Sequence, residues 1–314
     1  MISEGAPFYQ KILLNPTKAA AYWIETIDKV KIRAAHWPSN NSKGTIFLLP
    51  GRTEYIEKYG GIAANFSKLG YNLLVVDWRG QGLADRLSSD RNLGHVDHFS
   101  DYQKDIDGLI SLAKFLSLPK PWFIIAHSMG GCIALRTLLT RTYFKAVTFS
   151  GPMWGIKIAI PLQTFTKYFA KASTVLGISH LYAPTTSRHC YCVVGLFKNN
   201  SLTNCKASWL HMQNQLLEKP SLQLGGPSMK WLDTAFQEMD QLFREVSPKT
   251  KCLCFMGEKE TVVSQSRIRH RMKNWPDGEL VTLHKGKHEV LMEDTTIVMQ
   301  VIQRIDRFFS DTNN

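Results

Sequence analysis

The sequence predicts a protein of the α/β class, with a mostly parallel sheet, helices on both faces and a helical insertion. Uniformly apolar stretches alternate with stretches of helical spacing, which is typical of βαβ units whose sheet is covered on both faces. The alternation stops for about 100 residues between FSGP and KCLCFM and then resumes. A chain of 314 residues is long enough for one such core with an insertion.

The strands and helices of this core are predicted from their apolar patterns. Strands are expected at 30–37, 45–50, 71–78, 121–126, 144–150, 251–256 and 279–284. Helices are expected at 54–70, 99–116, the segment after Ser128, 267–275 and 296–309. Right-handed crossovers between such strands place a site at their carboxyl ends.

The interruption defines the expected domain organisation. Residues 1–151 would form the first part of the core, 152–249 a helical cap insertion, and 250–314 the second part of the core. Aromatic and aliphatic residues recur in the insertion at helical spacing. That pattern fits helices that pack on each other, and it also fits a cap with an apolar inner face over a site. One set of helices can do both.

The chain has a formal net charge of +12, and the excess of basic residues is spread over residues 1–250 and is not concentrated in a tail or stripe. Basic residues outnumber acidic ones 18 to 12 in 1–150, 10 to 5 in 151–250, and 10 to 9 in 251–314. No run of five or six like charges occurs. Diffuse charge of this kind fits an anionic lipid surface at least as well as a nucleic acid, so charge alone does not decide between them.

Targeting and metal-binding signals are weak. The amino-terminal stretch lacks the apolar segment of a signal peptide, and no 18 uncharged apolar residues run together. We therefore expect a cytoplasmic protein whose six cysteines are reduced thiols. Their spacing lacks the C-x-x-C pairs and histidine partners of a zinc site, so we expect no metal or other cofactor.

The stretch IIAHSMGGC at 124–132 holds the candidate nucleophile. It nearly fits G-x-S-x-G, the strand-to-helix turn that exposes a nucleophilic serine in α/β-hydrolases, with Ala126 in place of the first glycine. Alone, a serine beside glycine at a turn is common and has little specificity. His127 is better explained as a neighbour that shapes the turn than as the base.

A base and an acid follow Ser128 in the chain order of α/β-hydrolases. Glu260 comes just after the strand KCLCFM, and His288 comes after the strand ELVTLH, where it is expected to open the final helix. A serine hydroxyl needs such a base, itself oriented by an acid. Glu258 is the alternative acid, but it lies too close to the end of the strand, and we expect it to be a solvated surface carboxylate.

A zinc site at His284 and His288 is the competing interpretation of this region. The two histidines are four residues apart, but Gly286 lies between them and a strand precedes them, so one helical face is not expected.

Two backbone amides are candidates for the oxyanion hole. One is the amide of Met129, directly after the nucleophile, and the other is that of Arg52 in the PGRTEY loop after the strand TIFLLP. A plain strand-to-helix turn is the alternative explanation of that loop.

The chain resembles the lysophospholipase L2 type of α/β-hydrolase, which is related to monoacylglycerol lipases. The resemblance rests on PGRTEYIEKY (50–59), DWRGQGLADR (77–86), GHVDHFSDY (94–102), AHSMGG (126–131), NSLTNC (200–205), LGGPSMKWL (224–232) and GKHEVLMED (286–294). It implies a catalytic triad of Ser128, Glu260 and His288. The chain departs from the family's pattern at three positions: Ala126 in place of Gly, Cys205 in place of Asp, and Ser228 in place of Thr.

The resemblance also implies a function: a serine hydrolase that cleaves the carboxylic ester of lysophospholipids in a bacterial cell, near the cytoplasmic membrane. The expected partners are a monoacyl lipid and the anionic inner face of the cytoplasmic membrane. A nucleic acid is not expected as a partner. Monoacylglycerol or another short ester is the alternative substrate, and a non-catalytic binding scaffold is the alternative of another class. Dehalogenases and epoxide hydrolases of this fold use Asp where this chain has Ser128.

Overall fold

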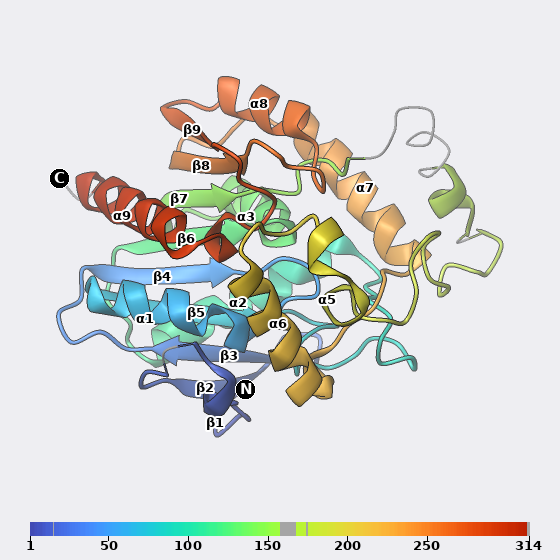
Figure 1. The fold of residues 1–314 in the computed structure, drawn as a ribbon, viewed down its shortest axis with the longest axis horizontal. Helices are drawn as coiled ribbons and strands as arrows, with labels where there is room; N and C mark the ends of the chain where they lie inside the picture. Colours follow the sequence, from blue (N-terminus) through green and yellow to red (C-terminus); the bar gives the residue numbers. More distant parts are fainter. Residues whose placement is uncertain (15, 158–167, 174, 313–314) are drawn as a thin grey trace.

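One sheet organises the computed structural model, which describes residues 1–14, 16–157, 168–173 and 175–312. Within these residues nine strands pair in the order β1-β2-β3-β5-β4-β6-β7-β8-β9. The strands from β5 to β9 are parallel, whereas β1, β2 and β3 join antiparallel at one side. Figure 1 shows the sheet with helices on both faces, as the α/β-hydrolase prediction requires.

The seven predicted strands are confirmed with small shifts at their ends. They are β3 (Lys31–Trp37), β4 (Gly44–Leu49), β5 (Tyr71–Asp77), β6 (Trp122–His127), β7 (Phe144–Ser150), β8 (Lys251–Gly257) and β9 (Gly278–Leu283). The apolar pattern missed β1 (Ile2–Glu4) and β2 (Ala20–Glu25). These strands are short or half-exposed at the sheet edge, so they lack the apolar run that identified the others.

Helices cover the two faces unequally. On one face, α1 (Gly60–Lys68) and α9 (Thr295–Asp311) pack on the sheet, and both lie in front of it in Figure 1. The other face carries α2 (Tyr102–Phe115), α3 (Met129–Thr140) and α8 (Gln265–Lys273). These five helices confirm the predicted core helices.

The interval 152–249 is inserted between β7 and β8, and this inserted region supplies helices that lie beyond the carboxyl ends of the parallel strands, on the right in Figure 1. They include the single turn α5 (Tyr191–Val194), α6 (Lys206–Glu218) and α7 (Met229–Arg244), and residues 168–173 are also helical. The expected helical stretch at 161–182 lies partly outside the described residues. The buried face of α7 joins the core cluster that contains α2 and α3, so this helix packs on the core as well as over the strand ends.

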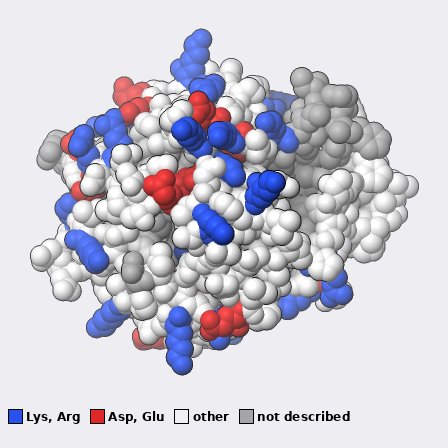
Figure 2. Space-filling model, viewed as in Figure 1, with Lys and Arg blue, Asp and Glu red and all other residues white. Residues whose placement is uncertain are grey.

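The surface agrees with the diffuse charge of the sequence. On the face of the molecule that Figure 2 shows, basic side chains are scattered with acidic ones between them, and they form no continuous basic stripe. Among the described residues, no helix is both long and apolar enough to cross a bilayer.

Candidate active site

Ser128 stands on a strained turn between β6 and α3. Its φ of 48° and ψ of −114° lie outside ordinary helical geometry, which is uncommon for a residue with a Cβ. The turn is held in place because the Ser128 amide donates to the Ser150 carbonyl oxygen at 3.1 Å and its own carbonyl oxygen accepts from the Met153 amide at 2.8 Å. The hydroxyl is thereby presented at the carboxyl edge of the sheet.

The two small residues around Ser128 carry different constraints. A Cβ at Gly130 would overlap the Leu49 carbonyl oxygen and lie 2.6 Å from that of Pro50, so the helix can approach β4 only with glycine here. Ala126 is fully buried in the core cluster, and Ser128 has its strained turn geometry with alanine at this position. The substitution of alanine for the usual glycine is therefore a local variation of the elbow.

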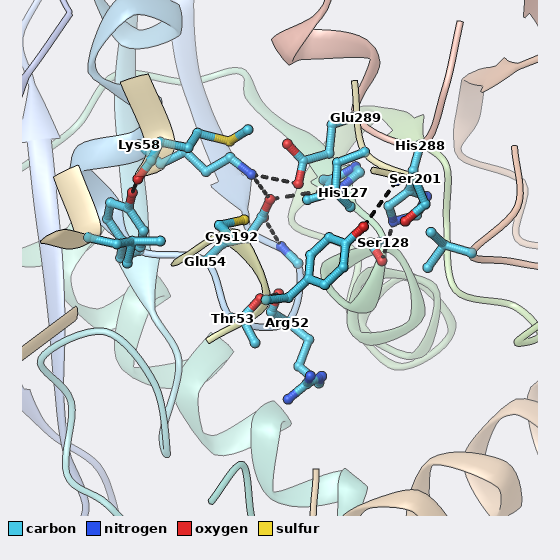
Figure 3. Close-up of a pocket in the computed structure, with 17 residues that line it drawn as sticks. Arg52, Thr53, Glu54, Lys58, His127, Ser128, Cys192, Ser201, His288 and Glu289 are labelled. Atoms are coloured by element: carbon cyan, nitrogen blue, oxygen red, sulfur yellow. Dashed lines mark hydrogen bonds and ion pairs between the residues drawn. The ribbon is translucent and has the colours of Figure 1, made fainter. Parts of the chain in front are cut away.

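His288 and Glu260 lie against Ser128 in a connected series of hydrogen bonds (Figure 3 shows His288 beside Ser128). The Ser128 Oγ is 2.9 Å from the His288 Nε2, and the His288 Nδ1 is 2.6 Å from the Glu260 Oε2. A carboxylate only accepts, so the Nδ1 donates to Glu260 and the Nε2 is left to accept from the serine hydroxyl. All three side chains are at most 9% exposed.

Glu260 is held as an ionised acceptor by its own loop. Its Oε1 accepts from the amides of Val262 at 2.6 Å and Val263 at 3.1 Å. Burial raises the pKa of this carboxyl, but the hydrogen bond and charge of His288 and the two amides outweigh burial and hold the pKa below its usual value.

The neighbouring acid has a different environment. Glu258 is exposed and pairs with the exposed His284 at 3.0 Å, which confirms it as a surface carboxylate. His284 therefore points to Glu258, while His288 points to Ser128, and the two histidines do not form a common metal site.

The expectation that His288 opens the final helix is wrong. His288 lies in the loop after β9, and α9 begins only at Thr295, after the short 3-10 turn Val290–Met292. The Asp294 side chain caps α9 by accepting from the amides of Thr296 and Ile297, so the helix start is fixed downstream of the histidine.

The loop 51–54 lies beside Ser128 and is held by hydrogen bonds from two sides. A Cβ at Gly51 would lie 3.1 Å from the Ser128 Cβ, so the loop backbone is next to the serine. The Gly51 amide donates to the Glu54 Oε2, and the Gly51 carbonyl oxygen accepts from the Gln81 Nε2 at 2.8 Å. The DWRGQG segment thus supplies a side chain, Gln81, that fixes the loop carrying Arg52.

The two amides expected at an oxyanion hole are both unused. In the parts of the chain that the structure describes, neither the Arg52 amide nor the Met129 amide donates to another protein group. Met129 is also the first residue of α3, where the helix dipole favours negative charge.

A buried ionic cluster, which sequence reasoning missed, supports the loop. The Lys58 Nζ lies 2.5 Å from the Glu54 Oε1 and 2.8 Å from the Glu289 Oε1, and the Tyr59 hydroxyl donates to the Glu54 Oε2 at 2.7 Å. Burial would raise the pKa of Glu54, but Lys58 holds it below its usual value, whereas burial raises that of Glu289. The available signals in the sequence were that Glu54, Lys58 and Tyr59 belong to the segment PGRTEYIEKY and that Glu289 directly follows His288.

Glu54, Glu289 and His127 also bring potential metal-ligand atoms within 4.8 Å of one another. The Lys58 ammonium lies between the two carboxylates and already supplies their positive charge, so these residues fit an ion pair better than a metal ion. His127 donates its Nδ1–H to the Ser150 carbonyl oxygen at 2.9 Å, and burial lowers its pKa to about 4. It is thus a neutral neighbour of His288, as its place beside the turn predicted.

The NSLTNC segment fastens the inserted region to the histidine loop. The Leu202 carbonyl oxygen accepts from the Glu289 amide at 2.8 Å, and the Asn200 carbonyl oxygen accepts from the Lys287 Nζ at 2.8 Å. The Glu293 carboxylate in turn accepts from the Asn204 amide at 2.8 Å. Hydrogen bonds from the insertion therefore hold the residues on either side of His288.

Ser228 and Cys205, two of the departures, lie at helix starts in the inserted region. The Ser228 Oγ caps α7 by accepting from the Trp231 amide and lies 2.8 Å from the His95 Nδ1. Cys205 makes no side-chain cap on α6, where the Thr203 hydroxyl accepts from the Cys205 amide instead. Neither residue borders the cavity at Ser128.

A cavity of about 240 Å³ opens at Ser128 and His288 between the sheet edge and the inserted region. One wall is polar and carries Arg52, Glu54, Lys58 and Glu289. The residues that the region between β7 and β8 contributes to the lining are largely apolar: Tyr191, Cys192, Ser201, Leu202, Met212 and Leu216. A hydroxyl with a base in contact, free amides beside it and an apolar wall is an arrangement that can perform acyl transfer.

Several curated proteins are similar along most of their length. Lysophospholipase L2 of Escherichia coli (strain K12) is 27% identical over 302 residues, covering 92% of this chain and 86% of that protein. The probable lysophospholipase L2 of Haemophilus influenzae is 26% identical, covering 98% of this chain and 96% of that protein.

Solved structures show the same fold at lower identity. A soluble variant of monoglyceride lipase from Saccharomyces cerevisiae superposes with a TM-score of 0.71 at 19% identity, covering 92% of this chain and 94% of that one. A monoacylglycerol lipase from Paleococcus ferrophilus gives a TM-score of 0.69 at 18% identity, with coverages of 90% and 99%. The family Hydrolase_4, described as serine aminopeptidase, S33, matches residues 40–295, and the chain is therefore an α/β-hydrolase of that family.

Proposed function

We propose that the protein is a serine hydrolase that cleaves the acyl ester of lysophospholipids through an acyl-enzyme intermediate. The observation that carries the proposal is the buried contact of the Ser128 Oγ with the His288 Nε2, continued to Glu260, at the floor of a cavity with one apolar wall. The similarity to lysophospholipase L2 proteins along most of both chains supports the choice of substrate.

In the proposed reaction the Ser128 Oγ attacks the ester carbonyl carbon while its proton passes to the His288 Nε2. Glu260 stabilises the imidazolium that forms, since its Oε2 accepts from the Nδ1 at 2.6 Å. His288 returns the proton to the glycerol oxygen as the ester bond breaks. Water then attacks the acyl-enzyme by the same route and releases the fatty acid, so the cycle needs no cofactor.

The amides of Arg52 and Met129 are the proposed oxyanion hole. Both amides are free of protein acceptors among the described residues, Met129 directly follows Ser128, and Gly51, the neighbour of Arg52, lies beside the Ser128 side chain, all of which support the assignment. Donors of this kind are each worth about 3–4 kcal/mol of transition-state stabilisation in other serine hydrolases.

Residues 152–249 are the proposed cap, between core parts 1–151 and 250–314. The cap side chains at the cavity wall, among them Leu202, Met212 and Leu216, would contact the acyl chain. The hydrogen bonds between NSLTNC and the histidine loop support one unit of cap and triad.

A substrate panel tests the proposal. We expect purified protein to hydrolyse lysophosphatidylethanolamine faster than a monoacylglycerol with the same acyl chain, measured as kcat/KM from fatty-acid release. The reverse order would instead identify a monoacylglycerol lipase. A fluorophosphonate probe should label the protein covalently, and failure to label would favour a non-catalytic binding scaffold.

We further propose that the protein acts in the cytoplasm and contacts the anionic inner face of the cytoplasmic membrane. Many exposed large hydrophobic side chains belong to the inserted region, including Tyr168, Val175, Leu176 and Leu196, and the chain carries a net charge of +12. Each well-placed basic residue contributes about 1 kcal/mol at such a surface. We expect sedimentation with vesicles containing phosphatidylglycerol and less with pure phosphatidylcholine; equal binding to both would contradict the charge argument.

A further inference from the structure

The Arg52 side chain is a cation with no anionic partner in the candidate active site. No salt bridge to it occurs within the described residues, although carboxylates of Glu54 and Glu289 line the same cavity. Figure 3 shows the Arg52 side chain pointing away from Glu54, Lys58 and Glu289, so the buried ionic cluster does not neutralise it. A partly buried guanidinium without a counter-ion is costly unless an anion binds there.

The guanidinium is oriented but only partly used. Its Nη1 donates to the Gly225 carbonyl oxygen at 2.9 Å, and its Cζ lies 5.7 Å from the centre of the Trp231 ring. No acceptor for the Nε or Nη2 is found along the described stretches of the chain. Burial lowers the pKa of this group to about 10, so it still carries its charge at neutral pH. An arginine held this way presents free N–H groups to a planar or tetrahedral oxyanion.

The position of this cation matches the chemistry of the proposed substrate. The Arg52 backbone amide is a candidate oxyanion donor, so one side-chain length separates the ester carbonyl from the guanidinium. In a lysophospholipid the glycerol backbone alone separates the ester carbonyl from the phosphate, which is a comparable span. The ester and the phosphate can therefore meet the amide and the guanidinium of the same residue.

We propose that the Arg52 guanidinium binds the phosphate of the lysophospholipid head group and sets the preference over uncharged monoacyl esters. This inference rests on the proposed function, because it assigns the part of the substrate that a monoacylglycerol lacks. The hydrogen bond to the Gly225 carbonyl oxygen uses only the Nη1 donor of the guanidinium. If Arg52 served only to link the loop to the inserted region, its Nε and Nη2 donors would stay without an acceptor among the described residues.

The test compares two esters of the same acyl chain, lysophosphatidylethanolamine and monoacylglycerol, in wild type, Arg52→Gln and Arg52→Lys. The readout is the quotient of kcat/KM for lysophosphatidylethanolamine over kcat/KM for monoacylglycerol. An effect of the substitution on the oxyanion loop is common to both substrates and cancels in this quotient. We expect the quotient to fall by about 10- to 100-fold in Arg52→Gln, the range for a lost charge-assisted contact, and by less in Arg52→Lys. An unchanged quotient in Arg52→Gln would overturn the proposal.

Arg136→Gln is the matched control for a loosened cap. Arg136 on α3 pairs with Glu238 on α7 at 2.8 Å and lies outside the cavity, so it joins core and insertion without meeting the substrate. We expect Arg136→Gln to keep the wild-type quotient. A fall equal to that of Arg52→Gln would show that the cap attachment, and not a phosphate contact, sets the preference.

A second readout separates this inference from the proposed function. Glycerol 3-phosphate is tested as an inhibitor of p-nitrophenyl butyrate hydrolysis, with glycerol as the uncharged control and inorganic phosphate beside it. We expect the Ki of glycerol 3-phosphate to rise in Arg52→Gln and, in wild type, to be below that of inorganic phosphate. If wild type cleaves neither lipid, the proposed function fails, but the inhibition assay still tests Arg52. A Ki of glycerol 3-phosphate that is the same in wild type and Arg52→Gln would overturn the Arg52 assignment. A lower Ki for inorganic phosphate than for glycerol 3-phosphate in wild type would show that Arg52 binds free phosphate and not the head group of a lipid.

Discussion

Replacing Ser128 with alanine is expected to lower kcat for ester hydrolysis by about 10⁴- to 10⁶-fold, because the attacking oxygen is removed. His288→Ala should cost about as much, since the serine then has no base at 2.9 Å. The double variant should be little worse than either single one, because residues that act as a unit in catalysis have non-additive effects. The measurement is fatty-acid release at saturating lysophosphatidylethanolamine.

Covalent labelling distinguishes this result from misfolding. Ser128→Ala should lose reaction with a fluorophosphonate probe and keep the wild-type unfolding temperature, because its buried neighbours are unchanged. Ser150→Ala is a suitable control: its hydroxyl lies 3.2 Å from the His127 Nδ1 but not in the series from Ser128 to Glu260. Wild-type hydrolysis by Ser128→Ala would contradict the proposed nucleophile.

The positions of Ser128, Glu260 and His288, the proposed triad, were predictable because each residue follows an apolar strand. Such strands are recognised from composition alone, and the order of a parallel sheet brings their carboxyl ends together. The contacts that join Ser128, His288 and Glu260 agree with that expectation. The apolar pattern at 296–309 already placed the final helix close to its observed start at Thr295, so the expectation that His288 opens it conflicted with that pattern, and the Asp294 cap agrees with the pattern.

The support of the site was not predictable in the same way. Lys58 and Glu289 are far apart in sequence, and nothing in either local pattern indicates that they meet at 2.8 Å. Charged residues in an apparently amphipathic stretch are ordinarily solvated, so burial of Lys58 depends on tertiary packing. The same holds for Gln81, whose bond to Gly51 is visible only after β4 and β5 have paired.

Glu54→Gln is expected to lower kcat by about 10- to 100-fold, a part of the effect of a lost oxyanion donor. The Glu54 carboxylate accepts from the Gly51 amide and from the Tyr59 hydroxyl and pairs with Lys58. An amide side chain keeps the size of the carboxylate but presents a donor to one of these groups. The loop that carries the Arg52 amide would then shift away from the developing negative charge.

The division between kcat and KM separates this positioning role from a general loss of stability. An oxyanion donor acts mainly in the transition state, so KM should change little while kcat falls. Glu54→Asp keeps the charge and should recover part of kcat. Glu238→Gln breaks the ion pair with Arg136 outside the cavity and should leave kcat near the wild-type value, even with a lowered unfolding temperature. If Glu54→Gln raised KM and left kcat unchanged, Glu54 would contact the substrate and not hold the loop.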